Sequence, residues 1–183
     1  MLKLLSALIL IAMTPLSAQL LNWGVKGGVS LHNPIRASGI FSSDPPHWTV
    51  GPMAELNLPA GLGIEVDGLY RIIDYSTESR HGGLRSYNTW TIPVLAKYRL
   101  PARLKPLYLD AGLAVRFLQR LPIPSTSVGV VAGAGTRHKA KFLWISPELR
   151  YTRWNNDLFH TSFNGGILHT RKDQMELLIG VTF

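Results

Sequence analysis

Residues 107–117 read LYLDAGLAVRF, and the alternation of apolar and polar residues in this stretch decides the fold class of the chain. Side chains of a β-strand point alternately to its two faces. The leucines, Val115 and Phe117 therefore share one face, while Tyr108, Asp110 and Arg116 share the other. The pattern predicts a strand with one apolar and one polar face.

The same alternation returns in seven further segments, and helical periodicity is absent. These segments are residues 21–31, 48–58, 62–72, 90–99, 128–136, 143–151 and 175–183. Long polar connections at 32–47, 74–86, 118–125 and 155–173 alternate with tight turns at 59–61, 101–105 and 137–139. Long connections at one rim, short turns at the other and both chain ends on the short side predict an all-β, eight-stranded, antiparallel up-and-down transmembrane barrel.

The first 18 residues have the organisation of a cleavable signal peptide. Lys3 supplies a positive charge, residues 4–13 are apolar, and small residues precede the expected cleavage after Ala18. The apolar run is shorter than the roughly 20 residues that a membrane-spanning helix needs. We therefore expect an exported protein whose residues 19–183 form one barrel domain.

Composition narrows the functional classes. The absence of cysteine excludes a lipoprotein anchor and thiolate chemistry. The formal charge of +8 would suit nucleic acid, but an exported protein rarely meets any. Anionic lipid headgroups are the expected counterpart of this charge.

Alternation alone fits a soluble lipocalin-like barrel equally well, because such a barrel points its apolar face inward. Glycines, however, gather on the polar face, where missing side chains relieve crowding in a narrow interior. They are Gly24, Gly28, Gly51, Gly63, Gly112 and Gly180. Their placement favours a polar interior and an apolar exterior that faces lipid.

The charges of the polar face also balance, six acids against six bases. The acids are Glu55, Glu65, Asp67, Asp110, Glu148 and Glu176, and the bases are Lys26, Arg71, Lys97, Arg99, Arg116 and Arg150. A lumen too narrow for bulk water must compensate its charges, because an unpaired buried ion costs several kcal/mol. The set is therefore predicted to line the barrel interior, either as a plug of ion pairs or as the wall of a narrow pore.

Two further features suit an outer-membrane barrel. The chain ends at Phe183, with Ile179 and Val181 on the same face, as in the terminal signal that the barrel-assembly machinery reads. Aromatic residues on the apolar face suit the girdles found at both membrane interfaces, although core packing explains them as well. They are Trp23, Trp48, Tyr70, Trp90, Tyr98 and Tyr151.

Four stretches, in this order, resemble the outer-membrane protein β-barrel domain family of porin-like and PorT-like proteins, relatives in architecture of small OmpX-type barrels. The stretches are WGVKGGVSL at 23–31, WTIPVLAKY at 90–98, PLYLDAG at 106–112 and SPELRY at 146–151. The resemblance covers nearly all of residues 19–183. It implies an outer-membrane barrel of a Gram-negative-type bacterium and carries no shared catalytic motif.

One catalytic alternative arises from residues 160–167. His160, Ser162 and the following Asn164-Gly165-Gly166 resemble the His/Ser stretch of barrel-type lipid A deacylases, with Glu176 as the orienting acid. A base and a hydroxyl two residues apart on a strand are able to form a nucleophile pair. Phe163 interrupts the expected Ser-Asn pair, and the neighbouring asparagines suggest a loop, so an enzyme is not the leading expectation.

Metal and cofactor sites are not expected. The six histidines are scattered among predicted loops and turns without ligand spacing. The basic residues of the long-loop rim are either merely solvated or pair with lipopolysaccharide phosphates. They are Arg36, Arg80, Arg85, Arg120, Arg171 and Lys172.

The leading hypothesis is a monomeric barrel with a role in envelope integrity or in contacts made by its loops. Its expected partners are outer-membrane lipids, lipopolysaccharide and the barrel-assembly machinery. A narrow passive porin is the second hypothesis, and a lipid A deacylase-like esterase is the third.

Overall fold

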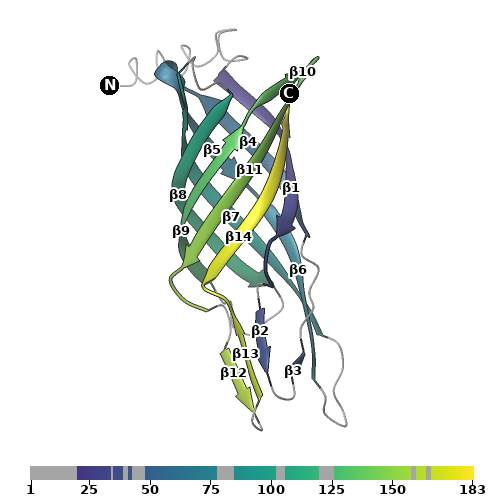
Figure 1. Ribbon diagram of the computed structural model, residues 1–183. Helices are drawn as coiled ribbons and strands as arrows, with labels where there is room; N and C mark the ends of the chain where they lie inside the picture. The colour runs from purple at the N-terminus through teal and green to yellow at the C-terminus, as the bar shows by residue number, and fades with distance from the viewer. Residues whose placement is uncertain are drawn as a thin grey trace, which may run out of the picture.

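Eight antiparallel wall strands close into a barrel in the computed structural model, as Figure 1 shows. The structure describes residues 20–33, 35–38, 41–42, 48–77, 85–101, 106–119, 126–157, 160–163 and 166–183. The wall consists of β1 (Leu21–Ser30), β4 (Trp48–Asn57), β5 (Leu62–Asp67) with β6 (Leu69–Thr77), β7 (Arg85–Arg99), β8 (Leu107–Gln119), β9 (Thr126–Thr136), β11 (Leu143–Trp154) and β14 (Asp173–Thr182). Because β1 pairs with both β14 and β4, the sheet closes on itself.

β5 and β6 form one continuous wall strand across Gly68. The Gly68 N–H donates to the Pro52 carbonyl oxygen at 2.9 Å. The pairs Met53↔Asp67 and Val50↔Tyr70 keep the same register on either side of Gly68. The inward and outward faces therefore continue without a slip from β5 into β6.

Several wall strands run farther toward the long-loop rim than alternation predicted. β7 begins at Arg85 instead of residue 90, and β8 continues to Gln119. The regular apolar alternation ends before the strand pairing does, because pairs such as Asp74↔Ser86 and Asn88↔Gln119 continue the ladder. The apolar pattern alone therefore underestimates strand length.

The long connections contain strands that the sequence analysis treated as loops. β12 (His160–Phe163), β13 (Gly166–Thr170) and β2 (Ile35–Ser38) form a separate three-stranded sheet, and β3 (Phe41–Ser42) pairs with β6. In Figure 1 these strands extend the molecule beyond one rim of the barrel. Their short segments lack the repeated alternation on which strand prediction depends.

Tight turns and both ends of the barrel wall lie at the opposite rim. A 3-10 turn, η1 (Pro59–Gly61), joins β4 to β5, with Gly61 at φ +79°. The β9 hairpin continues through β10 (His138–Ala140), so its turn lies at Lys141 and Phe142 rather than at the expected 137–139. The Phe183 N–H donates to the Trp23 carbonyl at 3.0 Å, which ties the end of the wall to its beginning.

No helix among the described residues is long and apolar enough to cross a membrane. The expected signal peptide, residues 1–18 with cleavage after Ala18, lies outside the described residues.

The two faces of the wall differ sharply in chemistry. Outward residues are mainly apolar and exposed, with Trp23 at 65%, Leu113 at 58% and Val130 at 61% of their full accessibility. Inward residues are mainly charged or small and are buried. An apolar surface of this extent is stable only against lipid or a partner, whereas the buried charges require compensation inside the barrel.

Candidate functional site in the barrel interior

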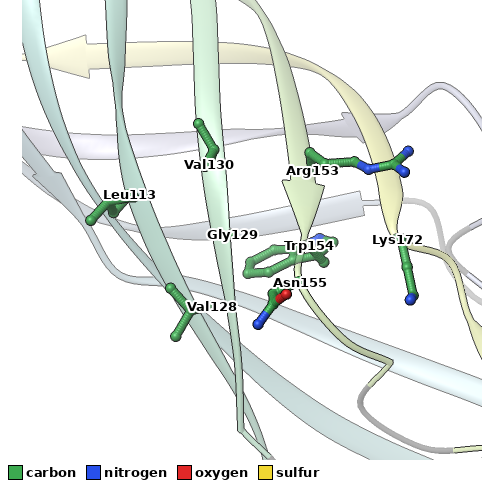
Figure 2. Close-up of a pocket in the computed structure, with 8 residues that line it drawn as sticks. All are labelled: Leu113, Val128, Gly129, Val130, Arg153, Trp154, Asn155 and Lys172. Atoms are coloured by element: carbon green, nitrogen blue, oxygen red, sulfur yellow. The ribbon is translucent and has the colours of Figure 1, made fainter.

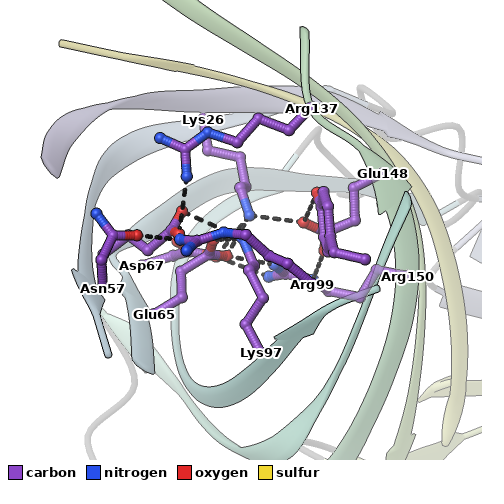
Figure 3. Close-up of polar contacts among 11 residues, drawn as sticks. Lys26, Asn57, Glu65, Asp67, Lys97, Arg99, Arg137, Glu148 and Arg150 are labelled. Carbon is purple, nitrogen blue, oxygen red and sulfur yellow. Dashed lines mark hydrogen bonds and ion pairs between the residues drawn. The ribbon is translucent and has the colours of Figure 1, made fainter. Parts of the chain in front are cut away.

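The centre of the barrel is occupied by ion pairs between distant strands, drawn in Figure 3. Lys26 of β1 pairs with Glu65 of β5, and its Nζ lies 2.8 Å from Glu148 Oε2 of β11 and 3.5 Å from Asp67 Oδ2. All four side chains are fully shielded from solvent. One ammonium group thus holds three strands together from within.

Arg150 of β11 supplies the second cation of this cluster. Its Nη1 donates to Asp67 at 2.8 Å, its Nη2 to Glu65 at 3.1 Å and its Nε to Glu148 at 2.6 Å. The flat guanidinium group suits this role because its donors point in several fixed directions at once. Lys26 and Arg150 therefore pair with the same three carboxylates.

A second group of pairs lies nearer the short-turn rim. Glu55 of β4 pairs with Arg99, with Arg137 at 3.0 Å and with Lys97 at 3.4 Å. Lys97 also pairs with Glu65, which links this group to the central cluster. The interior charges therefore form one connected network across the lumen.

Three residues of the network are not among the twelve charged residues that the sequence predicted to line the interior. Arg137 pairs with Glu55, Asn57 accepts a hydrogen bond from Arg99, and the Tyr108 hydroxyl donates to Glu148 at 3.1 Å. Arg137 was assigned to a turn, yet extending the predicted 128–136 strand by one residue would have placed it on the inward face.

The interior residues nearer the long-loop rim are arranged differently. Arg71 of β6 pairs with Glu176 of β14. Arg116 of β8 has no carboxylate within 4.0 Å among the described residues, and its guanidinium group lies 4.2 Å from the centre of the Trp154 ring. A cation over an aromatic face is stabilised by the ring quadrupole. Trp154, at the end of β11, lay beyond the predicted strand.

Among the six interior acids, Asp110 is the one without an ion pair to a described residue. Neither of its carboxylate oxygens has a hydrogen-bond partner among the described residues, although the side chain is buried. Gly133 faces it, and a Cβ atom at that position would overlap Asp110 Oδ1. The interior thus balances its charges as a set and not group by group.

Inward glycines allow neighbouring strands of the wall to approach closely. A Cβ atom at Gly24, Gly28 or Gly112 would overlap a carbonyl oxygen of the neighbouring strand. The restriction therefore comes from backbone atoms of the adjoining strand, and not from crowding between interior side chains alone. Glycine allows adjacent strands to approach this closely in a strongly curved sheet.

The outward aromatic residues lie toward both rims. The Trp23 and Phe183 rings are 5.4 Å apart near the short-turn rim, and the Tyr70 and Trp90 rings are 5.3 Å apart nearer the loop rim. Phe183 is 53% exposed at the end of the wall, a position that leaves the proposed assembly signal accessible.

The three residues of the catalytic alternative lie on strands of two different sheets. Glu176 faces the barrel interior and pairs with Arg71. His160 and Ser162 belong to β12, in the separate three-stranded sheet, and their side chains lie outside the described part. Glu176 therefore already has a structural partner.

Within the described ranges, no group of three or more histidine, cysteine, aspartate or glutamate residues is arranged to hold a metal ion. Of the basic rim residues, the side chains of Arg171 and Lys172 are described. Those of Arg36, Arg80, Arg85 and Arg120 lie outside the described residues.

No family model matches the chain, and no curated protein matches its sequence. Several solved structures share its fold, and two of them are outer-membrane or surface proteins of bacteria. Neisserial surface protein A has a TM-score of 0.51 and 15% identity, covering 88% of this chain and 94% of its own. The outer membrane protein OprG from Pseudomonas aeruginosa has a TM-score of 0.54 and 10% identity, covering 89% of this chain and 93% of its own.

The comparisons agree with the closed strand order of the barrel. The chain is an eight-stranded β-barrel of the outer-membrane type, with the architecture of the small OmpX-type barrels.

Proposed function

We propose that this protein is a monomeric outer-membrane barrel with a filled interior, which contributes to envelope integrity and presents its loops to partners. The observation that carries the proposal is the buried network around Lys26, Glu65 and Arg150. In a water-filled pore these side chains would be hydrated. Opening a passage here would separate several ion pairs at once, at a cost of several kcal/mol for each stranded charge.

The proposed partners follow from the two surfaces of the barrel. The apolar wall contacts outer-membrane lipids, and the basic loop rim meets the phosphates of lipopolysaccharide. The barrel-assembly machinery recognises the terminal strand that ends at Phe183. The proposed role requires neither a cofactor nor nucleic acid.

Planar-bilayer recording tests the filled interior. The refolded wild-type protein is expected to give no stable conductance steps. The double variant Glu65→Ala/Arg150→Ala, which removes two central side chains, is expected to produce them. Lys139→Gln, on the exposed hairpin outside the network, is the matched charge control and is expected to stay silent.

Heat-modifiable migration on gels confirms that each variant forms a barrel before recording. Large, stable conductance of the wild-type protein would overturn the proposal in favour of a narrow passive pore. For the deacylase alternative, mass spectrometry of lipid A from cells that express wild-type protein or Ser162→Ala is decisive. We expect identical acylation, and acyl loss that depends on Ser162 would contradict a non-catalytic role.

A further inference from the structure

A cavity of about 530 Å³ lies on the barrel wall near the loop rim, where β8, β9 and β11 adjoin the start of β14 (Figure 2). Its lining combines apolar residues with two cations. The lining residues are Leu113, Val128, Gly129, Val130, Arg153, Trp154, Asn155 and Lys172. We call this feature the rim groove.

Strand register places the apolar and cationic sides of the rim groove next to each other. Val130 pairs with Leu113 on one side and with Arg153 on the other. All three side chains point outward from the wall. Figure 2 shows Leu113, Val128 and Val130 on one side of the groove, and Arg153 and Lys172 on the other.

The floor and the edge of the rim groove are fixed by packing and backbone hydrogen bonds. The Trp154 ring lies behind Gly129, where a Cβ atom would approach its Cε3 to 2.8 Å. The Trp154 N–H donates to the Lys172 carbonyl at 2.7 Å, and the Asn155 N–H donates to the Val128 carbonyl at 2.8 Å. The groove is therefore built on ordered strand ends.

The cationic side retains unused donors. Arg153 pairs with Asp173, which also accepts a hydrogen bond from the Tyr151 hydroxyl at 2.6 Å. The Arg153 side chain is still 60% exposed, and its guanidinium has five N–H donors in all. No carboxylate among the described residues lies within 4.0 Å of the Lys172 ammonium group, so the groove carries a net positive charge.

We infer that the rim groove binds a phosphorylated glycolipid of the lipid A type. An acyl chain would lie along Leu113, Val128 and Val130, and a phosphate would receive charge-assisted hydrogen bonds from Lys172 and Arg153. Apolar wall directly beside cations matches a molecule that joins acyl chains to phosphate. The loop rim is opposite the chain ends and the short turns, and it therefore faces the outer leaflet.

This inference rests on the outer-membrane setting of the proposed function. The proposed function and this inference are tested separately, because conductance tests the barrel interior and lipid binding tests the outer wall. A conducting barrel that binds lipid in the rim groove would contradict only the filled interior, and a silent barrel that binds no glycolipid would contradict only the rim-groove inference.

Native mass spectrometry of the refolded protein in detergent, titrated with bis-phosphorylated hexa-acyl lipid A, tests the inference. We expect Arg153→Gln/Lys172→Gln to weaken binding about tenfold or more, since a lost charge-assisted hydrogen bond has this effect. Val130→Trp fills the apolar side and is expected to weaken binding several-fold without altering charge. Lys139→Gln, at the opposite rim, is expected to bind as the wild type does.

Two comparison lipids identify the chemistry. Dephosphorylated lipid A is expected to lose the dependence on Arg153 and Lys172, and phosphatidylglycerol is expected to bind at least tenfold more weakly than lipid A. Equal binding by the groove variants and the wild type would overturn the inference, as would an equal loss in Lys139→Gln. Equal affinity for phosphatidylglycerol would refute the glycolipid assignment. Heat-modifiable migration of each variant excludes misfolding as the cause.

Discussion

The Lys26 ammonium of β1 pairs with the Glu65 carboxylate of β5 inside the barrel, and both side chains have no exposure to solvent. Glu65 also pairs with Lys97 and Arg150, so three cations share this carboxylate. Removing its charge would leave these cations buried with less compensation than they have in the wild type.

Glu65→Gln is therefore expected to lower the free energy of unfolding by about 3–5 kcal/mol, the usual cost of breaking a buried ion pair from one side. Urea titration in lipid vesicles, followed by tryptophan fluorescence, measures the change. The double variant Lys26→Met/Glu65→Gln restores the charge balance and is expected to recover part of the loss. Additive losses in the double variant would contradict coupling between these two residues.

The Arg153–Asp173 pair makes the opposite prediction, because both side chains are about half exposed or more. Water and salt screen such a pair, and the side chains lose entropy when they are held together. Asp173→Asn is expected to leave the unfolding midpoint unchanged within error in the same titration. A loss comparable to that of Glu65→Gln would show that exposure does not distinguish the two pairs.

Adjacent glycines of β1 offer a matched test of wall curvature. A Cβ atom at Gly28 would overlap the Leu177 carbonyl oxygen, whereas at Gly27 the nearest atom, the Thr49 carbonyl oxygen, is 3.3 Å away. Gly28→Ala is expected to destabilise the barrel by about 3 kcal/mol or more, because backbone atoms must move.

Gly27→Ala is the control, and it is expected to fold in nearly wild-type yield. The folded fraction on gels and the urea midpoint report both effects. Similar behaviour of the two alanine variants would disprove the role assigned to close strand approach at Gly28.

The outward face predicts a cost that depends on membrane depth. Val94 of β7 is 49% exposed and lies between Val66 and Leu113 in the wall. Val94→Arg is expected to cost about 2–4 kcal/mol in vesicles, as for arginine near the bilayer midplane. Leu58→Arg, beside the η1 turn, is expected to cost about 0–1 kcal/mol. Equal costs at both positions would argue against a membrane between the rims.

The glycines and the balanced charges of the polar face were needed to predict which face lies inside, but alternation along the strands was sufficient to predict the eight wall strands. It succeeds because each wall strand is lined by lipid on one face and by the narrow interior on the other. The sequence did not predict β2, β12 and β13, since these short segments lack the repeated alternation of the wall strands. Strand ends beyond the apolar band, such as Arg85–Asn88 in β7, were missed for the same reason.

The alternation of odd and even positions predicted which side chains face the interior, but it did not predict which of them pair with one another. Residue parity says which side chains share the lumen, whereas contacts such as Lys26 with Glu148 depend on strand register around the closed barrel. The rim groove was not foreseen, although Lys172 was singled out as a rim cation. Its formation depends on Val130 standing between Leu113 and Arg153, a relationship that only the register reveals.

The central claim is that the apolar face meets lipid. Because the chain has no cysteine, Leu149→Cys introduces a single labelling site on the outer wall, directly paired with Leu177. A fluorophore attached there, in vesicles containing brominated lipids, measures contact with acyl chains. We predict strong quenching by brominated lipid and little by aqueous iodide, whereas strong iodide quenching without lipid quenching would contradict the account.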